Sequence, residues 1–257
     1  MRYPLNVFLK RWVSVNLAIM QEFFFDKRGL IILNDATYAE DGVVSTSYTG
    51  FLDDLIFHTA YIENSKETFN SHSHSGSKSG TTRWRSHIVC WAFNQAKFLE
   101  GDLLEFGVYY GHLMATACDY HKFQNWDKTL FLIDTWGENS QYDKSNRYSQ
   151  DIFEEVKLKF SEYNNVKLIR GLVPEVLNKI ECKKISFISL DMNSGMPEHL
   201  VLKELWDRMV PGSIVYLDDY GDLNHANVRK EIDIIFRDKN ETILCFPNKV
   251  GIVVKAS

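Results

Sequence analysis

Three features are absent from the sequence. No apolar run approaches the ~20 residues that a helix needs to cross a bilayer, so no membrane span is predicted. The four cysteines are scattered without a C-x-x-C pair, which favours buried thiols in a reducing compartment over a metal or redox site. Lysine and arginine number 29 against 34 aspartates and glutamates, and this lack of a basic surplus argues against nucleic acid as a partner.

The N-terminal residues also lack the marks of a secretory signal. The first 29 residues are apolar, but they contain Lys10, Arg11 and Glu22 and no small-residue cleavage site. We therefore predict a packing helix here and a cytoplasmic protein. The length of 257 residues suits one α/β core with an appendage.

The chain divides near residue 82. Residues 1–82 contain helical patches, such as FLDDLIFHTAYIEN, and end in the segment NSKETFNSHSHSGSKSGTT. The low complexity of this segment predicts a mobile loop, while His72 and His74 leave a metal site as the alternative. We predict a helical N-terminal extension over 1–82 and an α/β domain over 83–257.

Strand-like and helical stretches alternate in residues 83–257. After the helical RWRSHIVCWAFNQAKFL come five apolar runs: DLLEFG, TLFLIDTW, VKLIRG, ISFISLD and SIVYLDD. Continuous apolar runs are typical of parallel strands buried on both faces. Two intervening segments place apolar residues on one helix face: Leu202, Leu205, Trp206 and Met209, and then Val228, Ile232, Ile235 and Phe236. The alternation predicts a doubly wound, mostly parallel sheet of the Rossmann-like class.

The C-terminus refines this prediction. ETILCFPNKVGIVVKA contains two strand-like runs joined by only PNK. Strands with so short a link must be antiparallel, because a parallel crossover needs a dozen or more residues. A seven-stranded sheet closed by an antiparallel hairpin is the arrangement of class I S-adenosylmethionine (SAM) methyltransferases, and an ordinary dinucleotide-binding sheet does not end this way.

Two glycines interrupt the chain after the first strand, in E-F-G-V-Y-Y-G-H. Ligands bind at this loop in open α/β sheets, and glycine lets the backbone come close to them. A dinucleotide site favours G-x-G-x-x-G, and the third glycine is missing. The carboxylate of Glu105 suits SAM, which carries an ammonium and a sulfonium and no phosphate. The alternative is that Gly107 and Gly111 only turn the chain.

The next strand ends in Asp134, about twenty residues beyond Gly111. A carboxylate there can accept both hydrogen bonds of a ribose diol, and Trp136 can lie against the adenine. The alternative is an ordinary strand-end aspartate and a packing tryptophan. The candidate SAM-binding residues in these two loops are Glu105, Phe106, Gly107, Tyr109, Gly111, His112, Asp134, Thr135 and Trp136.

Three carboxylates end the remaining strands. Asp191 follows ISFISL, and Asp218 and Asp219 follow SIVYL. Adjacent strands would bring them to one edge of the sheet, where like charges repel and a divalent cation such as Mg²⁺ resolves the repulsion. The alternative is that one or two of them are helix N-caps.

These motifs as a set resemble the macrocin/mycinamicin/noviose-type sugar O-methyltransferases. The resemblance rests on LLEFGVYYGHLMA, LIDTWGE, LIRGLVPEVL, the run ISLDMNSGMPEHLVLKELWDRMVPGSIVYLDDYG and H-x-x-V-R-K-E-I-D, and it covers about residues 83–257. It implies a class I enzyme that depends on SAM and Mg²⁺, with the metal held by Asp191, Asp218 and Asp219. It also implies a SAM contact at the turn of Gly171, and an N-terminal region that helps to build the substrate pocket and the contacts of a homo-oligomer.

Two positions depart from the family pattern. His112 stands where members usually have a second glycine, and Asn193 stands where they commonly have an aspartate that is a candidate general base. An amide cannot take up a proton at physiological pH. We therefore consider two histidines as the base, and favour His225, next to the proposed metal, over His112, beside the cofactor loop.

The expected activity is transfer of a methyl group from SAM to a hydroxyl of a sugar, a sugar-bearing natural product or a glycan. The catalytic residues would be Asp191, Asn193 and His225. Two alternatives stay open: a SAM-binding protein without activity or with another specificity, which the amide at Asn193 motivates, and an NAD-dependent sugar-modifying enzyme on the same type of sheet.

Overall fold

The computed structural model describes residues 22–26, 29–33, 38–40, 43–65, 82–137 and 152–256. A seven-stranded sheet forms its centre, in the order β10-β11-β9-β8-β5-β6-β7. Its strands are β5 (Asp102–Phe106), β6 (Leu130–Asp134), β7 (Val166–Arg170), β8 (Ile185–Leu190), β9 (Met209–Leu217), β10 (Leu244–Cys245) and β11 (Gly251–Val254). Strands β5 to β9 pair in parallel, and β11 runs antiparallel to β9 and to β10. The predicted fold class and the terminal hairpin are confirmed.

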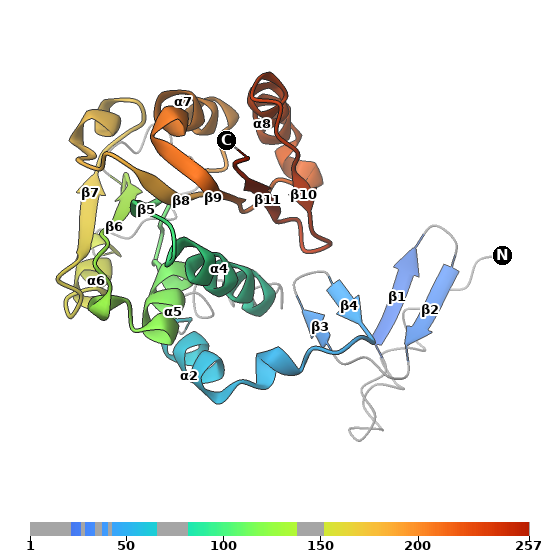
Figure 1. Ribbon diagram of the computed structural model, residues 1–257. Helices are drawn as coiled ribbons and strands as arrows, with labels where there is room; N and C mark the ends of the chain where they lie inside the picture. Colours follow the sequence, from blue (N-terminus) through green and yellow to red (C-terminus); the bar gives the residue numbers. More distant parts are fainter. Residues whose placement is uncertain are drawn as a thin grey trace.

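Helices cover both faces of the sheet (Figure 1). They are α4 (Arg83–Ala96), α5 (His112–His121), α6 (Ile152–Lys159), α7 (Gly195–Leu205) and α8 (Ala226–Asp238). Every residue of β6 and β8 is buried, as expected for central strands covered on both sides. In the part of the chain that the structure describes, none of the helices combines the length and hydropathy of a membrane-spanning segment.

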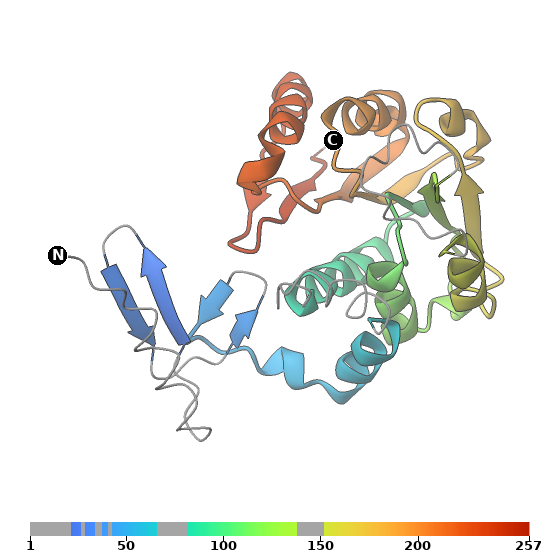
Figure 2. The same cartoon turned by 180° about the vertical axis from the view of Figure 1, so that it is seen from behind.

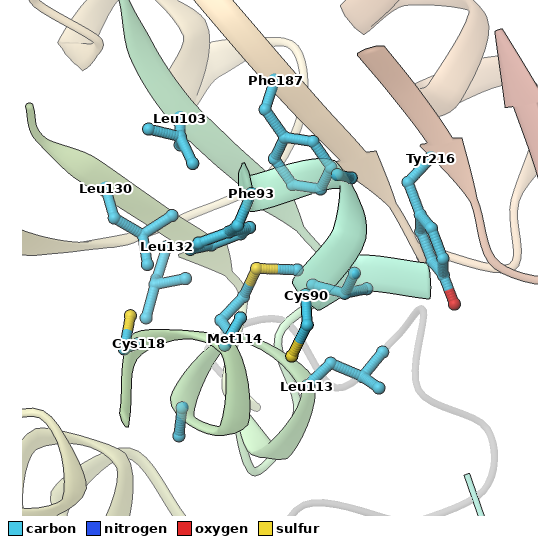
Figure 3. Close-up of a cluster of buried hydrophobic side chains, with 14 of the residues drawn as sticks. Cys90, Phe93, Leu103, Leu113, Met114, Cys118, Leu130, Leu132, Phe187 and Tyr216 are labelled. Carbon is cyan, nitrogen blue, oxygen red and sulfur yellow. The ribbon is translucent and has the colours of Figure 1, made fainter. Parts of the chain in front are cut away.

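The core has two parts, one on each face. Figure 3 shows the part under α4 and α5, where Phe93 and Met114 pack against Leu103, Leu132 and Phe187 of the sheet. The other part lies under α7 and α8 and includes Leu104, Ile188, Leu202, Val215 and Ile232. Together they hold the parallel strands in register, and this register positions the loops at the carboxyl ends of the strands.

The N-terminal extension differs in part from the expected helices. Residues Glu22–Asp26 (β1) and Gly29–Leu33 (β2) form one antiparallel pair, and Tyr38–Glu40 (β3) and Val43–Ser45 (β4) form a second. Both pairs project from the main body in Figures 1 and 2. The runs EFFFD and GLIIL are rich in residues that favour strands, so the predicted packing helix is wrong for Glu22–Asp26 and for Gly29. Its first 21 residues, and most of the predicted mobile loop with His72 and His74, lie outside the described residues.

The predicted helix in FLDDLIFHTAYIEN is confirmed as a short 3-10 turn, η1 (Gly50–Asp53), followed by α2 (Leu55–Asn64). Asp54 caps α2, because its carboxylate accepts hydrogen bonds from the backbone N–H groups of Ile56 and Phe57. At the other end, the Asn64 amide donates to Asp119 Oδ2 on α5 at 2.6 Å. This contact attaches the extension to the α/β domain.

Two smaller predictions need correction. Helix α7 ends at Leu205 and a 3-10 turn (η4, Trp206–Arg208) follows it, so Met209 belongs to β9 and does not complete the helix face. Cys90, Cys118 and Cys182 are buried free thiols as expected, but Cys245 is exposed on the edge strand β10.

Candidate active site

The order in which strands are added to the sheet reverses between β5 and β8: β6 and β7 follow β5 on one side, and β8 and β9 lie on the other. Strand β5 pairs with β6 on one side and with β8 on the other, and β8 pairs with β9. The last paired residues are Phe106, Leu190 and Leu217, so Gly107, Asp191 and Asp218 follow side by side. A reversal of this kind is where ligands bind in open α/β sheets.

Gly107 has φ +89°, a conformation that residues with a side chain rarely adopt. A Cβ atom on this residue would lie 2.1 Å from the carbonyl oxygen of Asp191. In addition, the backbone N–H of Asp191 donates to the carbonyl of Phe106 at 2.8 Å. Gly107 therefore does more than turn the chain. It lets the loop from Gly107 to Gly111, called the glycine loop below, lie directly against the backbone of Asp191 at the end of β8.

We expect Gly107→Ala to destabilise the protein by about 2–4 kcal/mol, because backbone atoms cannot move away from the new methyl group as a side chain can. Urea unfolding measures the loss. Gly212→Ala is the matched control: Gly212 has φ +83°, but its added Cβ would meet only the side chain of Leu99, at 3.4 Å. Equal losses in the two variants would show that φ, and not the contact with Asp191, imposes the glycine.

The rest of the glycine loop is tied to the end of β6. The backbone N–H of Tyr109 donates to Asp134 Oδ2 at 2.8 Å, and that of Trp136 donates to Asp134 Oδ1 at 3.1 Å. The Thr135 hydroxyl also donates to Asp134, and the Trp136 indole donates to the carbonyl of Tyr109 at 3.0 Å. The carboxylate of Asp134 thus holds the two loops together at this edge of the sheet.

Trp136 is buried and packs against Phe153, with ring centroids 4.9 Å apart. This arrangement matches the packing alternative, and contact with an adenine stays a prediction. Gly111, with φ +69°, precedes α5, and His112 Nε2 lies 3.1 Å from the hydroxyl of Thr82. Gly171 directly follows β7 and donates its N–H to the carbonyl of Asp134, so it borders the same edge of the sheet.

Glu105 has a buried carboxylate oxygen without a hydrogen-bond partner in the part of the chain that the structure describes. It is buried in β5, and within the described residues its Oε2 atom has no hydrogen-bond partner. Burial, together with the carboxylates of Asp134 and Asp218, raises the pKa of Glu105 well above its usual range. A buried acceptor without a donor beside two positive-φ glycines fits the ammonium group of SAM, which offers donors and a positive charge.

Asp191, Asp218 and Asp219 converge as predicted. Each offers a carboxylate oxygen, and these atoms lie within 4.8 Å of one another. Burial and then the charges of Asp218 and Asp219 raise the pKa of Asp191 well above its usual range. The three form the acid cluster, and Asn193, with φ +53°, lies beside it with its amide 3.4 Å from Asp191 Oδ1.

The positive charge of Arg85, from α4, offsets part of the repulsion among the carboxylates of the acid cluster. The guanidinium forms ion pairs with Asp218 and with Asp219, the latter at 3.2 Å. On the other side, His225 Nδ1 lies 3.5 Å from Asp219 Oδ2 without hydrogen-bond geometry, and it has no hydrogen-bond partner among the described residues. The structure therefore brings His225 to the cluster, and places His112 beside the glycine loop.

Two hollows of very different size lie near these residues. The acid cluster borders a cavity of about 10 Å³, room for roughly one water-sized particle. A groove of about 540 Å³ lies along α4 and the β10–β11 edge. Its walls include Trp84, His87, Ile88 and Trp91, which share one face of α4, and Phe51 and Phe246. None of the three carboxylates of the acid cluster lines the groove. We therefore assign the chemistry to the cluster and consider the groove only for binding.

Arg85 and Glu198 were not predicted from the sequence. The signal for Arg85 was present, because it shares the buried stripe of its helix with Val89, Ala92 and Phe93. Glu198 of α7 borders the small cavity and is 4% exposed. Burial raises its pKa to about 7, although backbone hydrogen bonds at Ser194 and Met192 act in the opposite direction.

This shift makes stability depend on pH. In the folded state Glu198 keeps its proton up to about pH 7, whereas in the unfolded state it loses the proton near pH 4.5. The free energy of unfolding that protonated Glu198 contributes is therefore lost as the pH rises through this interval. We expect urea unfolding at pH 5 and pH 8 to show that Glu198→Gln abolishes about 3 kcal/mol of this loss. The control Glu204→Gln, exposed on the same helix, should lose as much stability as wild type. A pH dependence equal in Glu198→Gln and wild type would contradict the assignment.

The chain is similar to known methyltransferases. Residues 104–220 match a family model described as a methyltransferase domain, and no curated protein matches the chain. The O-methyltransferase NovP is similar in structure, with a TM-score of 0.56 and 17% identity over 67% of this chain and 80% of that one. CalS11, a TDP-rhamnose 3'-O-methyltransferase of calicheamicin biosynthesis, is similar with a TM-score of 0.52 and 14% identity. The match covers 75% of this chain and 93% of that one.

A third similar structure is the SAH-bound methyltransferase PaMTH1 of Podospora anserina, with a TM-score of 0.53 and 14% identity over 100% of this chain and 99% of that one. Identities this low establish the fold alone, whereas the family model covers the glycine loop, the end of β6 and the acid cluster in one segment. The chain therefore has the Rossmann-like fold that these methyltransferases share, and its residues 104–220 match the model of a methyltransferase domain.

Proposed function

We propose that the protein is a SAM-dependent O-methyltransferase that acts on a hydroxyl of a sugar or of a sugar-bearing natural product, with a divalent cation at the acid cluster. The observation that carries the proposal is the convergence of Asp191, Asp218 and Asp219 beside the glycine loop. NovP and CalS11, which are similar in fold, are O-methyltransferases, and CalS11 acts on a TDP-linked sugar.

The residues present suit both groups. Gly107, Gly111, Glu105 and Asp134 would hold SAM, which when bound supplies a methyl group on a positively charged sulfur. The acid cluster has the hard oxygen donors that Mg²⁺ prefers, and a bound divalent ion would lower the pKa of an acceptor hydroxyl. The chain's own residues orient the acceptor beside β8 and β9, and His225 takes its proton as the oxygen gains the methyl group.

The groove along α4 bears on the type of acceptor. Trp84 lines the groove, and the next residue of α4, Arg85, forms ion pairs with the acid cluster. Aromatic walls favour an apolar or stacking group, and a volume of about 540 Å³ lies in the usual range of ligand sites. We propose that the acceptor joins an apolar part, held in the groove, to a hydroxyl-bearing ring at the cluster.

Methyl transfer from labelled SAM to a panel of sugars, nucleotide sugars and glycosides tests the function. Label should enter a product with MgCl₂ present, and glycosides with an apolar aglycone should react faster than the matching free sugars. Incorporation into protein or into amines alone would contradict a hydroxyl acceptor. SAM binding without transfer to any member of the panel would favour the reading as a binding protein without this activity.

Cofactor binding gives a separate prediction. We expect Asp134→Ala to weaken S-adenosylhomocysteine (SAH) binding about 10- to 100-fold, because it removes a carboxylate acceptor for the ribose and loosens the loops at Tyr109 and Trp136. Calorimetry measures the dissociation constant. Asp127→Ala, which removes an exposed carboxylate from the loop before β6, should leave it unchanged. An unaltered SAH affinity in folded Asp134→Ala would remove the ribose role.

A further inference from the structure

Arg85 is a charged residue in a place where apolar residues are the rule. It lies in the first turn of α4 and is 7% exposed, and Val89, one turn further along the helix, is fully buried. Burying a guanidinium without partners would be costly, so its position depends on the groups around it. Those groups include the carboxylates of Asp218 and Asp219 and the backbone carbonyls of Asp218 and Asn248.

The hydrogen bonds of Arg85 occupy the acceptors that a cation would need. Nη1 donates to Asp218 Oδ2 and to Asp219 Oδ1, and Nη2 donates to Asp219 Oδ1 at 3.2 Å and to the carbonyl of Asn248 at 3.4 Å. The other oxygen of Asp218 accepts from the hydroxyl of Tyr216 at 2.8 Å. Both oxygens of Asp218 and one of Asp219 are thus engaged by donors of the chain itself.

A divalent cation bound to the same carboxylates would meet this guanidinium at close range. Two positive groups a few ångströms apart in a buried site repel strongly, since little water screens them. The space is limited as well: the cavity at the cluster holds about one water-sized particle, whereas Mg²⁺ usually keeps several of its waters. The cation and Arg85 cannot both take their preferred positions on Asp218 and Asp219.

We propose that Arg85 is a built-in counter-ion of the acid cluster that competes with the divalent cation and thereby sets its affinity. The proposal rests on the proposed metal site. With no metal present, Arg85 neutralises part of the charge of the three carboxylates and keeps the site folded. When the cation binds, the guanidinium gives up Asp218 and Asp219, while the carbonyl of Asn248 remains available to it.

Binding of Mn²⁺ alone tests the competition without any turnover. Electron paramagnetic resonance of free Mn²⁺ gives the dissociation constant for the wild type, Arg85→Gln and Arg85→Lys. We expect Arg85→Gln to bind Mn²⁺ at least tenfold more tightly, and Arg85→Lys to lie between it and the wild type, because lysine keeps the charge but not the two-pronged contact. Arg208→Gln is the matched control, because Arg208 donates only to the carbonyls of Ile180 and Cys182 among the contacts described for it.

The outcomes separate the two proposals. Equal Mn²⁺ affinity in all variants, or weaker binding in Arg85→Gln, would overturn the competition and leave the metal site standing. No Mn²⁺ binding at millimolar concentration by folded wild type and folded Arg85→Gln would overturn both. If Arg85→Gln does not fold, Arg85→Lys decides alone: an affinity equal to that of the wild type contradicts the competition, and a tighter one supports it.

Discussion

Replacing Asp191 by asparagine is expected to make the metal-free protein more stable and the enzyme about a thousandfold slower. Asp191 is half-buried beside Asp218 and Asp219, and no hydrogen bond from Arg85 to Asp191 is among those described. The neutral amide removes a like-charge repulsion, so we expect a gain of about 1 kcal/mol. It also removes one of three anionic donors from the proposed cation site, and a thousandfold loss corresponds to about 4 kcal/mol of the barrier.

Thermal unfolding in EDTA and methyl transfer from labelled SAM measure the two effects on the same preparation. Asp102→Asn is the matched control: Asp102 begins β5 at the opposite edge of the sheet, where its carboxylate accepts from the backbone N–H of Thr129. This variant should lose stability and keep its activity. A lower melting temperature in Asp191→Asn, or activity within threefold of wild type, would contradict the assignment of Asp191.

The second large effect is expected at His225. Its Nδ1 atom is buried, lacks a hydrogen-bond partner among the described residues and lies 3.5 Å from Asp219 Oδ2. The neighbouring Asn193 cannot serve as a base, and an imidazole is suited to proton transfer near neutral pH. We expect His225→Ala to lower turnover by 10²- to 10⁴-fold with unchanged SAH affinity.

Two further variants distinguish the possible proton acceptors. His112→Ala should lower turnover less than His225→Ala, since His112 contacts Thr82 beside the glycine loop. A faster Asn193→Asp enzyme would mean that the missing carboxylate, and not a histidine, limits the rate. If His225→Ala and Asn193→Asp both turn over a verified acceptor at the wild-type rate, the proton leaves through solvent and His225 is not the base.

The sheet was predictable from the sequence because each of its strands is a short apolar run with a polar or glycine residue at its end. This pattern also located the site, since Asp134, Asp191 and Asp218 each end or directly follow a strand. Strand order then brings Asp191 and Asp218 together, and the sequence shows that order only through the short link of the terminal hairpin.

What the sequence could not supply is the contact between distant elements. Arg85 meets Asp218 across 133 residues, and a periodicity that marks α4 as half buried does not say which charge lies opposite. The prediction for the N-terminal extension was wrong for a different reason. The run EFFFD has no helical periodicity, and it is identified as a strand only together with its partner GLIIL. Local sequence patterns indicate many of the helices and strands, but contacts between residues far apart in the sequence decide what each side chain meets.

The contact between Gly107 and Asp191 has a consequence for protein engineering. The backbone at the end of β5, which is proposed to hold SAM, packs directly on the backbone at the end of β8, which is proposed to face the acceptor, with no side chain between them that could adjust. A chimera that takes β8 and β9 from a relative to change the acceptor must preserve the pairing of Phe106 with Leu190. A graft that shifts this register by a single residue would move the proposed acceptor site away from the proposed SAM site.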